Sequence, residues 1–278
     1  MLIRLLLIFS YIYNCFRLKV EPWKFFQINA PYFNEQRNLF SKLDMDQRIP
    51  RRWRLEQFMD MGQRNPTSYP AFVKPEWGQN SQGIARADNL EQLQQIRQQH
   101  KKSNLNYIIQ HAAPGKREFE VFIIPNKARL DQLAVLSITE TCNRANDPFP
   151  INGVYNQSTY YKDQLNNLSL QQQNKIWSHL QQIGNFRIAR YGVRADSIEA
   201  LVAGDFHIIE INVYVPMPLI LLVNEVSSKK KIKFVLNAMQ HLAAVTKTIP
   251  ASQPSKSVFF KKLQRSRILK SLAKNEIS

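Results

Sequence analysis

Apolar side chains occupy alternate positions at Phe119, Val121 and Ile123. Successive side chains of a strand point to opposite faces, so this alternation predicts a strand with one buried face. Apolar runs at residues 107–109 and 133–138 predict two further strands, one before and one after it. We expect the first two strands to be joined through residues 111–115, and all three to form one antiparallel sheet.

Apolar residues spaced three or four apart predict helices between the strands. Asp88 can cap a helix that runs to Gln99 and turns Leu90, Leu93 and Ile96 inward. The same two patterns predict further strands at residues 71–73 and 206–211, and further helices at 169–183 and 234–244. Helices interspersed with antiparallel strands place the chain in the α+β class.

The size and charge of the chain restrict its partners. Of 278 residues, 44% are hydrophobic, which is enough to bury the core of one large domain or of two lobes. The 38 Lys and Arg residues exceed the 21 Asp and Glu residues, so the formal net charge is +17. Such a surface attracts polyanions, namely nucleotides, nucleic acid or an acidic bilayer. Cys15 and Cys142 match no metal-ligand spacing or disulfide framework, so we expect a reducing, cytoplasmic compartment.

Both ends of the chain have a biased composition. The tail from Ser255 to Lys274 interleaves seven Lys or Arg residues with apolar ones, which predicts a basic terminal helix. That helix is either solvated or in contact with an anionic membrane or nucleic acid. The apolar run Leu5–Phe16 is shorter than the roughly 20 residues that a membrane-spanning helix needs. A buried helix and a helix lying on a membrane both stay open here, so a membrane-peripheral location is an alternative to a purely cytoplasmic one.

A lysine at a strand end is followed by a loop of small residues. Lys74 closes the apolar run, and Gly78, Ser81 and Gly83 follow it. The lysine can hold phosphate oxygens by its charge, while backbone N–H groups of the loop bind the remaining oxygens. Because the lysine precedes the glycines, this is not a Walker loop. Taken alone, these residues are also typical of a plain surface hairpin.

Two further groups of polar residues lie on strands. The Glu118 carboxylate can accept hydrogen bonds from both ribose hydroxyls, and backbone groups near Ile109 and Gln110 can bind an adenine edge. Farther along, Glu210 and Asn212 are two apart on a strand and therefore share a face, so both can coordinate one hard cation such as magnesium. The alternatives are a solvated glutamate and a polar pair at a strand end.

In this order, the motifs resemble those of the ATP-grasp carboxylate-amine ligases related to D-alanine:D-alanine ligases. The resemblance covers about residues 42–218 and implies two α+β lobes whose antiparallel sheets enclose ATP. It also implies an organisation: residues 1–40 as an apolar and basic amino-terminal segment, 41–250 as the ATP-grasp domain and 251–278 as a basic tail. Within the domain, the nucleotide-binding lobe would span about 41–115 and the catalytic lobe about 116–250.

The resemblance further implies roles for single residues. Lys74 matches the family's phosphate-binding lysine, and Lys42 an upstream one. Glu118 matches the ribose-binding glutamate and Arg190 the arginine that steadies the transferring phosphoryl group. The remaining matches are the loop that closes on the phosphates (Gly78, Ser81 and Gly83), the adenine-binding segment (Ile109 and Gln110) and the paired magnesium ligands (Glu210 and Asn212).

Gly192 departs from the family's pattern. The family carries an aspartate that binds the metal two residues after the arginine, whereas glycine has no side chain for this purpose. Losing one carboxylate weakens magnesium binding, because only a few anionic ligands offset the dehydration of the ion. Asp196, four residues farther on, is the candidate for its replacement.

The function implied by the resemblance is an ATP-dependent ligase. Such enzymes activate a carboxylate as an acyl phosphate, which an amine then attacks, and the substrates would be small and amino-acid-like or peptide-like. Gly192 favours a competing function, a non-catalytic relative that binds nucleotide and regulates or scaffolds a partner. A third interpretation is a basic nucleic-acid or membrane-surface protein that uses the tail, and a homodimer is left open.

Overall fold

The computed structural model describes residues 2–78, 81–101, 103, 105–129, 131–154 and 156–275, and it contains two antiparallel sheets. The first sheet has the strand order β1-β4-β2-β3. Its strands are β1 (Gln57–Met59), β2 (Ala71–Pro75), β3 (Ala85–Ala87) and β4 (Tyr107–His111). The second sheet has the order β7-β6-β5-β8-β9. Its strands are β5 (Arg117–Pro125), β6 (Leu133–Asn143), β7 (Thr159–Asp163), β8 (Ala189–Ala195) and β9 (Phe206–Asn212).

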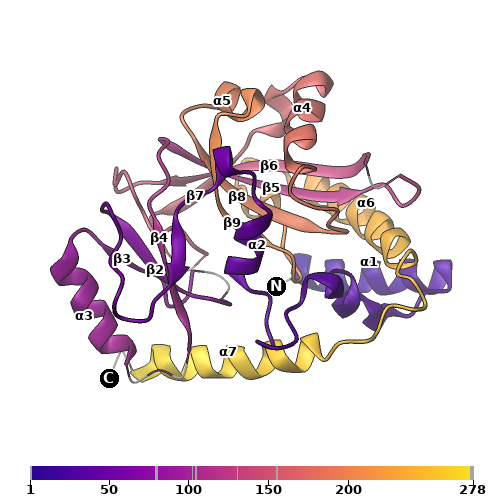
Figure 1. Cartoon of the computed structure of the whole chain (residues 1–278). Coiled ribbons are helices and arrows are strands. Elements are labelled where there is room, and N and C mark those ends of the chain that lie inside the picture. Colours follow the sequence, from indigo (N-terminus) through magenta and orange to yellow (C-terminus); the bar gives the residue numbers. More distant parts are fainter. Residues whose placement is uncertain are drawn as a thin grey trace.

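Two lobes therefore make up the molecule, one around each sheet (Figure 1). The predicted α+β class with two antiparallel sheets is confirmed. The alternation at Phe119, Val121 and Ile123 is confirmed as well, since all three side chains are fully buried in the core under the second sheet. The opposite face of β5 carries Glu118 and Glu120 at one end and, at the other, Phe122 and Ile124, which are buried in a second apolar cluster with residues of α1 and α6.

The expected pairing of the strand at 107–109 with the strand at 119–123 is wrong. β4 lies between β1 and β2 in the first sheet, whereas β5 lies between β6 and β8 in the second. The connection between them crosses from one lobe to the other. Gly115 permits this crossing, because its φ of +108° suits glycine and a Cβ would lie 3.0 Å from the Ala195 backbone nitrogen.

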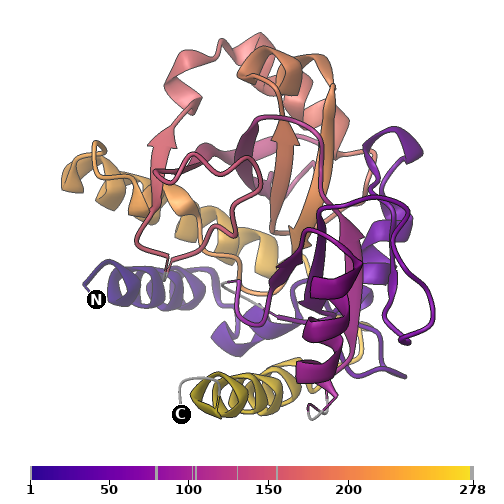
Figure 2. The same ribbon diagram turned by 90° about the vertical axis from the view of Figure 1, so that its left-hand side faces the viewer.

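The α-helices pack around the two sheets. They are α1 (Leu2–Leu18), α2 (Lys42–Arg48), α3 (Leu90–His100), α4 (Leu170–Leu180), α5 (Ile198–Ala203), α6 (Ser228–Thr246) and α7 (Val258–Asn275). Short 3-10 helices occur at Pro22–Gln27, Ala30–Tyr32, Arg51–Trp53, Leu165–Asn167 and Leu219–Leu222. Figures 1 and 2 show α3 beside the first sheet, and α4 and α5 at the far end of the second lobe.

The structure adjusts one helix start and confirms another helix. α3 is capped by Asn89, whose side chain accepts a hydrogen bond from the Gln92 backbone, and not by Asp88. Leu90 is consequently the first helical residue and is exposed, while Leu93 and Ile96 are buried as expected. α4 carries a full capping box at Ser169 and buries Ile176 and Leu180, but it ends at Leu180, three residues before the predicted end at residue 183.

The amino-terminal helix α1 packs on α6. Tyr11 and Cys15 are buried in a cluster with Val235 and Leu242 of α6, and the Tyr11 hydroxyl lies 3.1 Å from the Thr246 hydroxyl. Beyond α1, the Asn29 amide donates to two backbone carbonyls at the ends of β8 and β9. Among the helices of the described residues, none combines the length and apolar character needed to cross a membrane.

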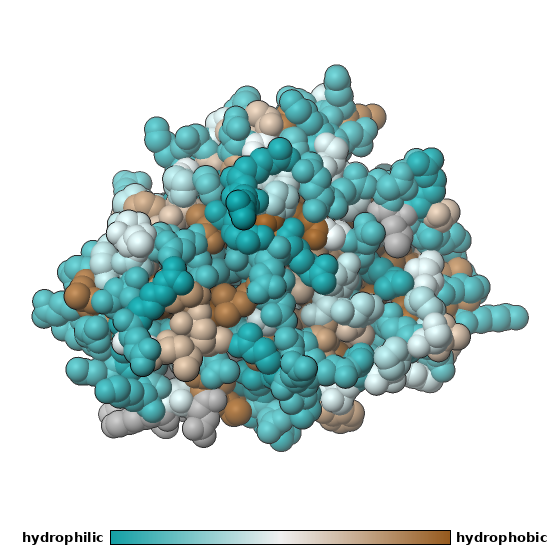
Figure 3. All heavy atoms as spheres, viewed as in Figure 1, coloured by the Kyte–Doolittle hydropathy of each residue, from teal (hydrophilic) through white to brown (hydrophobic). Residues whose placement is uncertain are grey.

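The basic tail forms α7, which runs along both lobes (Figure 1). Val258 is fully buried in the core under the second sheet, and Ile268 packs against the core of the first. Between them, the charged groups of Lys262 and Arg265 lie 4.6 and 5.9 Å from the ring centroid of Trp77. The side of α7 that faces the protein is therefore partly basic. On the face of the molecule seen in Figure 3, hydrophilic side chains predominate and apolar ones lie in small separate groups.

Candidate functional site

A cavity of about 330 Å³ lies between the two sheets, a volume within the range of small-molecule sites. Strands of both lobes line it. The first lobe contributes Phe72, Lys74, Ser81, Ile84, Gln110, His111 and Ala113. The second contributes Glu118, Glu120, Thr141, Tyr161, Arg190, Arg194, Ile209, Glu210, Asn212 and the segments 150–154 and 215–217. Arg4 of α1 and Leu219 complete the wall, so the amino-terminal segment belongs to the same site.

Lys74 connects the lobes across this cavity. Its Nζ donates to the Gln110 side chain at 2.7 Å and to the Ile209 backbone carbonyl, in the other sheet, at 2.9 Å. Burial, together with the nearby charge of Lys42, lowers the pKa of Lys74 to about 7, although Glu210 and Asp46 act in the opposite direction. An anionic ligand in the cavity would restore the charged form of this lysine.

A β-bulge gives Lys74 its partner. The register between β8 and β9 shifts so that Gly192 faces Glu210 while Val193 faces Ile208, which leaves Ile209 as an extra residue on β9. Ile209 and Glu210 consequently both line the cavity, although they are neighbours in sequence. The Ile209 carbonyl accepts from Lys74 and also, at 3.3 Å, from Gln110.

Glu118 lies on the cavity face of β5, opposite Arg194 of β8. Its Oε2 accepts a hydrogen bond of 3.0 Å from the Asn152 amide. Burial raises the pKa of Glu118 to about 7, and the Asn152 hydrogen bond and the Arg194 charge oppose this shift. Nearby, the Thr141 hydroxyl is buried and has no hydrogen-bond partner within the described residues, so the wall beside Glu118 holds an unused polar group.

Arg190, Glu210 and Asn212 lie together at the other part of the cavity. Arg190 donates to the Met217 carbonyl at 3.0 Å, and one of its guanidinium nitrogens is 3.7 Å from Glu210 Oε1. The Asn212 amide donates to the same Glu210 oxygen at 2.6 Å. Burial acts to raise the pKa of Glu210, but Arg190, Lys42 and Lys74 together hold it below its ordinary value. Glu210 is therefore an ionised carboxylate in a mainly cationic setting.

The structure adds Glu120, a residue that the sequence analysis did not single out. It lies two residues after Glu118 on the same face of β5, is buried, and places Oε2 at 2.9 Å from Arg190 Nε. Burial raises the pKa of Glu120, and Arg190 partly offsets that effect. The signal was present in the sequence, because any residue two positions from Glu118 on a strand shares its face.

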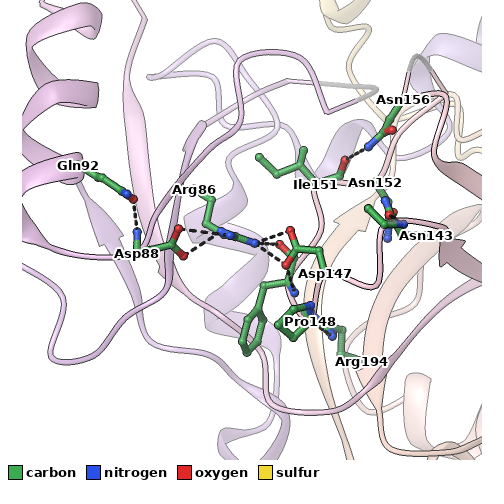
Figure 4. A network of polar contacts seen from close by, with 12 residues as sticks. Arg86, Asp88, Gln92, Asn143, Asp147, Pro148, Ile151, Asn152, Asn156 and Arg194 are labelled. Atoms are coloured by element: carbon green, nitrogen blue, oxygen red, sulfur yellow. Dashed lines mark hydrogen bonds and ion pairs between the residues drawn. The ribbon is translucent and has the colours of Figure 1, made fainter.

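The loop between β6 and β7 also contributes to the site, although no sequence motif indicates it. Figure 4 shows Asp147 of this loop between Arg86 of the first lobe and Arg194 of the second. Arg86 donates to both carboxylate oxygens of Asp147 at 2.7 Å, and Arg194 donates to the Pro148 carbonyl at 2.8 Å. Residues 150–154 then form one wall of the cavity. The loop is thus held over the site by both lobes.

Not every residue named from the sequence reaches this cavity. Lys42 donates to the Pro75 carbonyl and, with Gly78, lines a small adjoining pocket that also includes Glu210 and Asn212. Ile109 is buried in the first sheet between β1 and β2, so Gln110, His111 and Ala113 line the cavity in its place. Gly83 has a φ of +69° in the loop after Ser81, and its neighbours Ser81 and Ile84 line the cavity.

Asp196 is not brought into the site. It is exposed and follows the last residue of β8, four positions beyond Gly192. Because a strand rises about 3.3 Å per residue, the intervening residues carry its carboxylate roughly 13 Å along the strand from Gly192. The shifted backbone that its proposed role requires is not present, since the bulge lies on β9.

The donors in the cavity fit a magnesium nucleotide. No cluster of three or more His, Cys, Asp or Glu side chains suited to a metal ion occurs among the described residues. Magnesium in phosphate-transfer sites is usually held by one or two carboxylates together with substrate phosphates, so a three-carboxylate cluster is not required. Glu210 and Asn212 provide oxygens on one strand, and Lys74 and Arg190 provide positive charge for phosphates.

Comparison with solved structures finds several ligases. The chain is similar to an L-amino acid ligase from Bacillus licheniformis (15% identity, TM-score 0.46, covering 72% of this chain and 47% of that one). It is also similar to VanG D-Ala:D-Ser ligase from Enterococcus faecalis (13%, 0.49, 74% and 61%) and to D-alanine–D-alanine ligase from Bacillus anthracis complexed with ATP (12%, 0.44, 72% and 65%).

D-alanine ligases, the group that the sequence motifs resemble, are thus among the similar structures. The chain spans about half to two thirds of the length of these proteins. No protein-family model and no curated protein sequence matches it. At these identities and TM-scores the function of the chain has to be argued from its own site.

Proposed function

We propose that this protein is an ATP-dependent ligase that joins a carboxylate to an amine, with ATP bound between the two sheets. The observation that carries the proposal is the convergence of Lys74, Arg190 and the Glu210–Asn212 pair on one cavity, with Glu118 in the same wall. These residues come from strands of different lobes, so only the fold brings them together. Phosphoryl transfer needs positioning and charge neutralisation more than a reactive side chain, and this set supplies both.

Each residue has a defined task in this proposal. Glu118 accepts hydrogen bonds from the ribose hydroxyls, and Lys74 neutralises phosphate oxygens from the first lobe. Arg190 stabilises charge on the phosphoryl group during transfer. Glu210 and Asn212 hold magnesium, which when bound neutralises phosphate charge and orients the terminal phosphate.

The proposed reaction consists of two successive displacement steps. A carboxylate oxygen of the acid attacks the terminal phosphorus of ATP, the bond to the bridging oxygen breaks, and ADP leaves. The amine then attacks the carbon of the acyl phosphate, which releases inorganic phosphate and one proton and leaves an amide. Water must be kept from the acyl phosphate between the two steps. The loop at residues 144–154 is placed to do this, because Arg86 and Arg194 hold it over the cavity.

The test is release of ADP and phosphate from magnesium ATP in the presence of a panel of amino acids and small peptides. We expect release that depends on an added acid and amine, and that is lost in Lys74→Ala and Glu210→Gln. Tight ATP binding with no turnover on any pair would instead favour a nucleotide-binding scaffold protein. Absence of ATP binding would refute the proposal.

A further inference from the structure

Glu120, Gly192 and Glu210 form a row across three neighbouring strands. In the register of the second sheet, Glu120 of β5 faces Gly192 of β8, and Gly192 faces Glu210 of β9. Both glutamates line the cavity. The glycine in the centre therefore separates two carboxylates that lie on the same side of the sheet.

The space above Gly192 is filled by its neighbours. A Cβ at this position would lie 3.0 Å from Glu210 Cγ, 3.1 Å from Ile209 Cγ1 and 3.3 Å from Glu120 Oε1. These separations are shorter than ordinary contacts of a Cβ atom, so a larger side chain at 192 requires Glu210, Ile209 and Glu120 all to shift. An oxygen of Glu120 thus occupies the region that a carboxylate on residue 192 would reach.

The two glutamates also share a cationic partner. Arg190 Nε is 2.9 Å from Glu120 Oε2, and another nitrogen of the same guanidinium is 3.7 Å from Glu210 Oε1. Because both glutamates lie close to the one guanidinium group of Arg190, their carboxylates must also lie close to each other. Strands are about 4.8 Å apart, so a glutamate on β5 is long enough to extend over the glycine toward β9.

We propose that Glu120 is the second carboxylate of the magnesium site, supplied from β5 and facing Glu210 across Gly192. The inference rests on the proposed function, because the cation would be the one that accompanies ATP. Two carboxylates, the Asn212 amide and substrate phosphates form an oxygen ligand set of the kind magnesium prefers. Gly192 is then the residue that makes room for Glu120, and not a sign of a lost site.

Binding of Mn²⁺, a paramagnetic substitute for magnesium, tests the inference without relying on activity. The free Mn²⁺ signal in electron paramagnetic resonance is titrated with the full-length protein in the presence of a non-hydrolysable ATP analogue. We expect Glu120→Gln to weaken Mn²⁺ binding by about tenfold or more, a scale that even outer-shell changes reach. Binding of the analogue without metal should stay within about twofold of the unchanged protein, since only a metal ligand is removed.

Two variants serve as controls. Glu210→Gln should weaken Mn²⁺ binding as Glu120→Gln does. Glu140→Gln should not, although Glu140 is also buried, because it lies on β6 and its carboxylate pairs with Arg117 outside the cavity. Normal Mn²⁺ affinity in Glu120→Gln together with weakened affinity in Glu210→Gln would overturn the inference and leave the proposed function intact. Failure of the unchanged protein to bind the nucleotide analogue would overturn both.

Moving the carboxylate back by one strand gives a second test. Glu120→Ala should weaken Mn²⁺ binding, and adding Gly192→Asp to that variant should recover part of the loss, because the Glu120 oxygen is gone and the side chains of Glu210 and Ile209 have to shift by only a few tenths of an ångström to admit the new Cβ. A folded double variant, verified by its circular dichroism and cooperative unfolding, that recovers no affinity would contradict the ligand row. Should the double variant not fold, the Glu120→Gln titration decides alone.

Discussion

Lys74 has hydrogen-bond partners in both sheets, and this makes its substitution informative. Lys74→Met keeps most of the apolar length of the side chain and removes the charge. We expect nucleotide affinity to fall about tenfold or more, which corresponds to roughly 1.4 kcal/mol, because charge-assisted contacts to phosphate are lost. Isothermal titration with an ATP analogue measures this change. The exposed Lys116→Met serves as the control, and equal affinities in both variants would contradict the assignment.

Lys262 is a buried cation that faces an aromatic ring. It is 5% exposed, and burial, followed by the charges of Lys42 and Arg265, lowers its pKa to about 7. An unfolded lysine has a pKa of about 10.4. Between these values the unfolded chain binds a proton that the folded chain does not, so the free energy of unfolding should rise with pH from about 7 to 10.

Lys262→Met tests this linkage. Removing the buried amine should raise the free energy of unfolding at pH 7 by about 1–3 kcal/mol, the cost of burying a polar group. The variant should also show a smaller rise in stability between pH 7 and pH 9.5 than the unchanged protein. Urea denaturation at several pH values measures both effects. Identical pH dependence in the two proteins would show that the amine is not buried in solution, and exposed Lys233→Met is the matched control.

At the scale of residues, the sequence was most informative where a strand carried the signal. Lys74, Glu118 and Arg190 are named through the resemblance of their motifs to those of ATP-grasp ligases, and the structure brings all three to one cavity. Glu120 was missed because its role depends on which residue faces it across the sheet, and pairing register is not visible in one strand. Asp196 is close to Gly192 in sequence, but β8 is extended, so four residues place Asp196 beyond the end of the strand and away from the cavity.

At the scale of elements, the loop between β6 and β7 is tied to the first lobe by the ion pair between Arg86 and Asp147 and by the Ser81 hydroxyl, which donates to the Asn152 carbonyl. Arg86 contacts both carboxylate oxygens of Asp147 and also the Phe149 carbonyl. Arg86→Met should loosen the loop and admit water, so that ADP is released in excess of the amide product. The ratio of ADP to amide measures this, with a ratio near one expected for the unchanged protein. A ratio near one in the variant would argue against the loop as a barrier; Arg129→Met, which breaks an exposed pair with Asp131, is the control.

The elements themselves were largely predictable, whereas their assignment to sheets was not. Periodicity identified β5, β9 and α4 because burial on one face leaves a repeated apolar signal. It could not show that β4 and β5 belong to different sheets, since the turn at Gly115 looks the same whether it joins paired strands or separate lobes. Strands of three residues, such as β1 and β3, are too short to show a period.

At the scale of the whole molecule, α7 joins the two lobes. Val258, its first residue, is buried in the core of the second lobe, and Ile268 packs against the core of the first. The sequence predicts a basic helix that is either solvated or in contact with an anionic membrane or nucleic acid, whereas α7 packs on the protein itself. Phe260 and Leu263 are exposed, while Lys262 and Arg265 lie over Trp77. Lys262 can form part of the packed face of α7 because the long aliphatic stem of a lysine can cover an aromatic ring such as that of Trp77.

Removing α7 should therefore affect both lobes. A chain that ends at Gln253 loses the buried Val258 and the ring contact between Phe259 and Phe26, at 4.6 Å between centroids. We expect the unfolding temperature to fall by about 5 °C or more, which corresponds to a few kcal/mol for a protein of this size. Hydrogen exchange should increase around Trp77 as well. An unchanged unfolding temperature together with unchanged exchange would mean that α7 does not pack on the protein in solution.

The extra residue in β9 also changes which positions of the strand face the core and which face the cavity. Up to Ile208, even-numbered positions of β9 belong to the core, as in any strand with a period of two. After Ile209 the parity is reversed, and the even-numbered Glu210 and Asn212 belong to the cavity. Regular alternation through Ile209, without the bulge, would turn Glu210 and Asn212 toward the core, so the bulge directs the acidic end of the strand into the cavity. Whether a side chain of β9 lies in the core or in the cavity therefore depends on its position relative to the bulge as well as on its residue type.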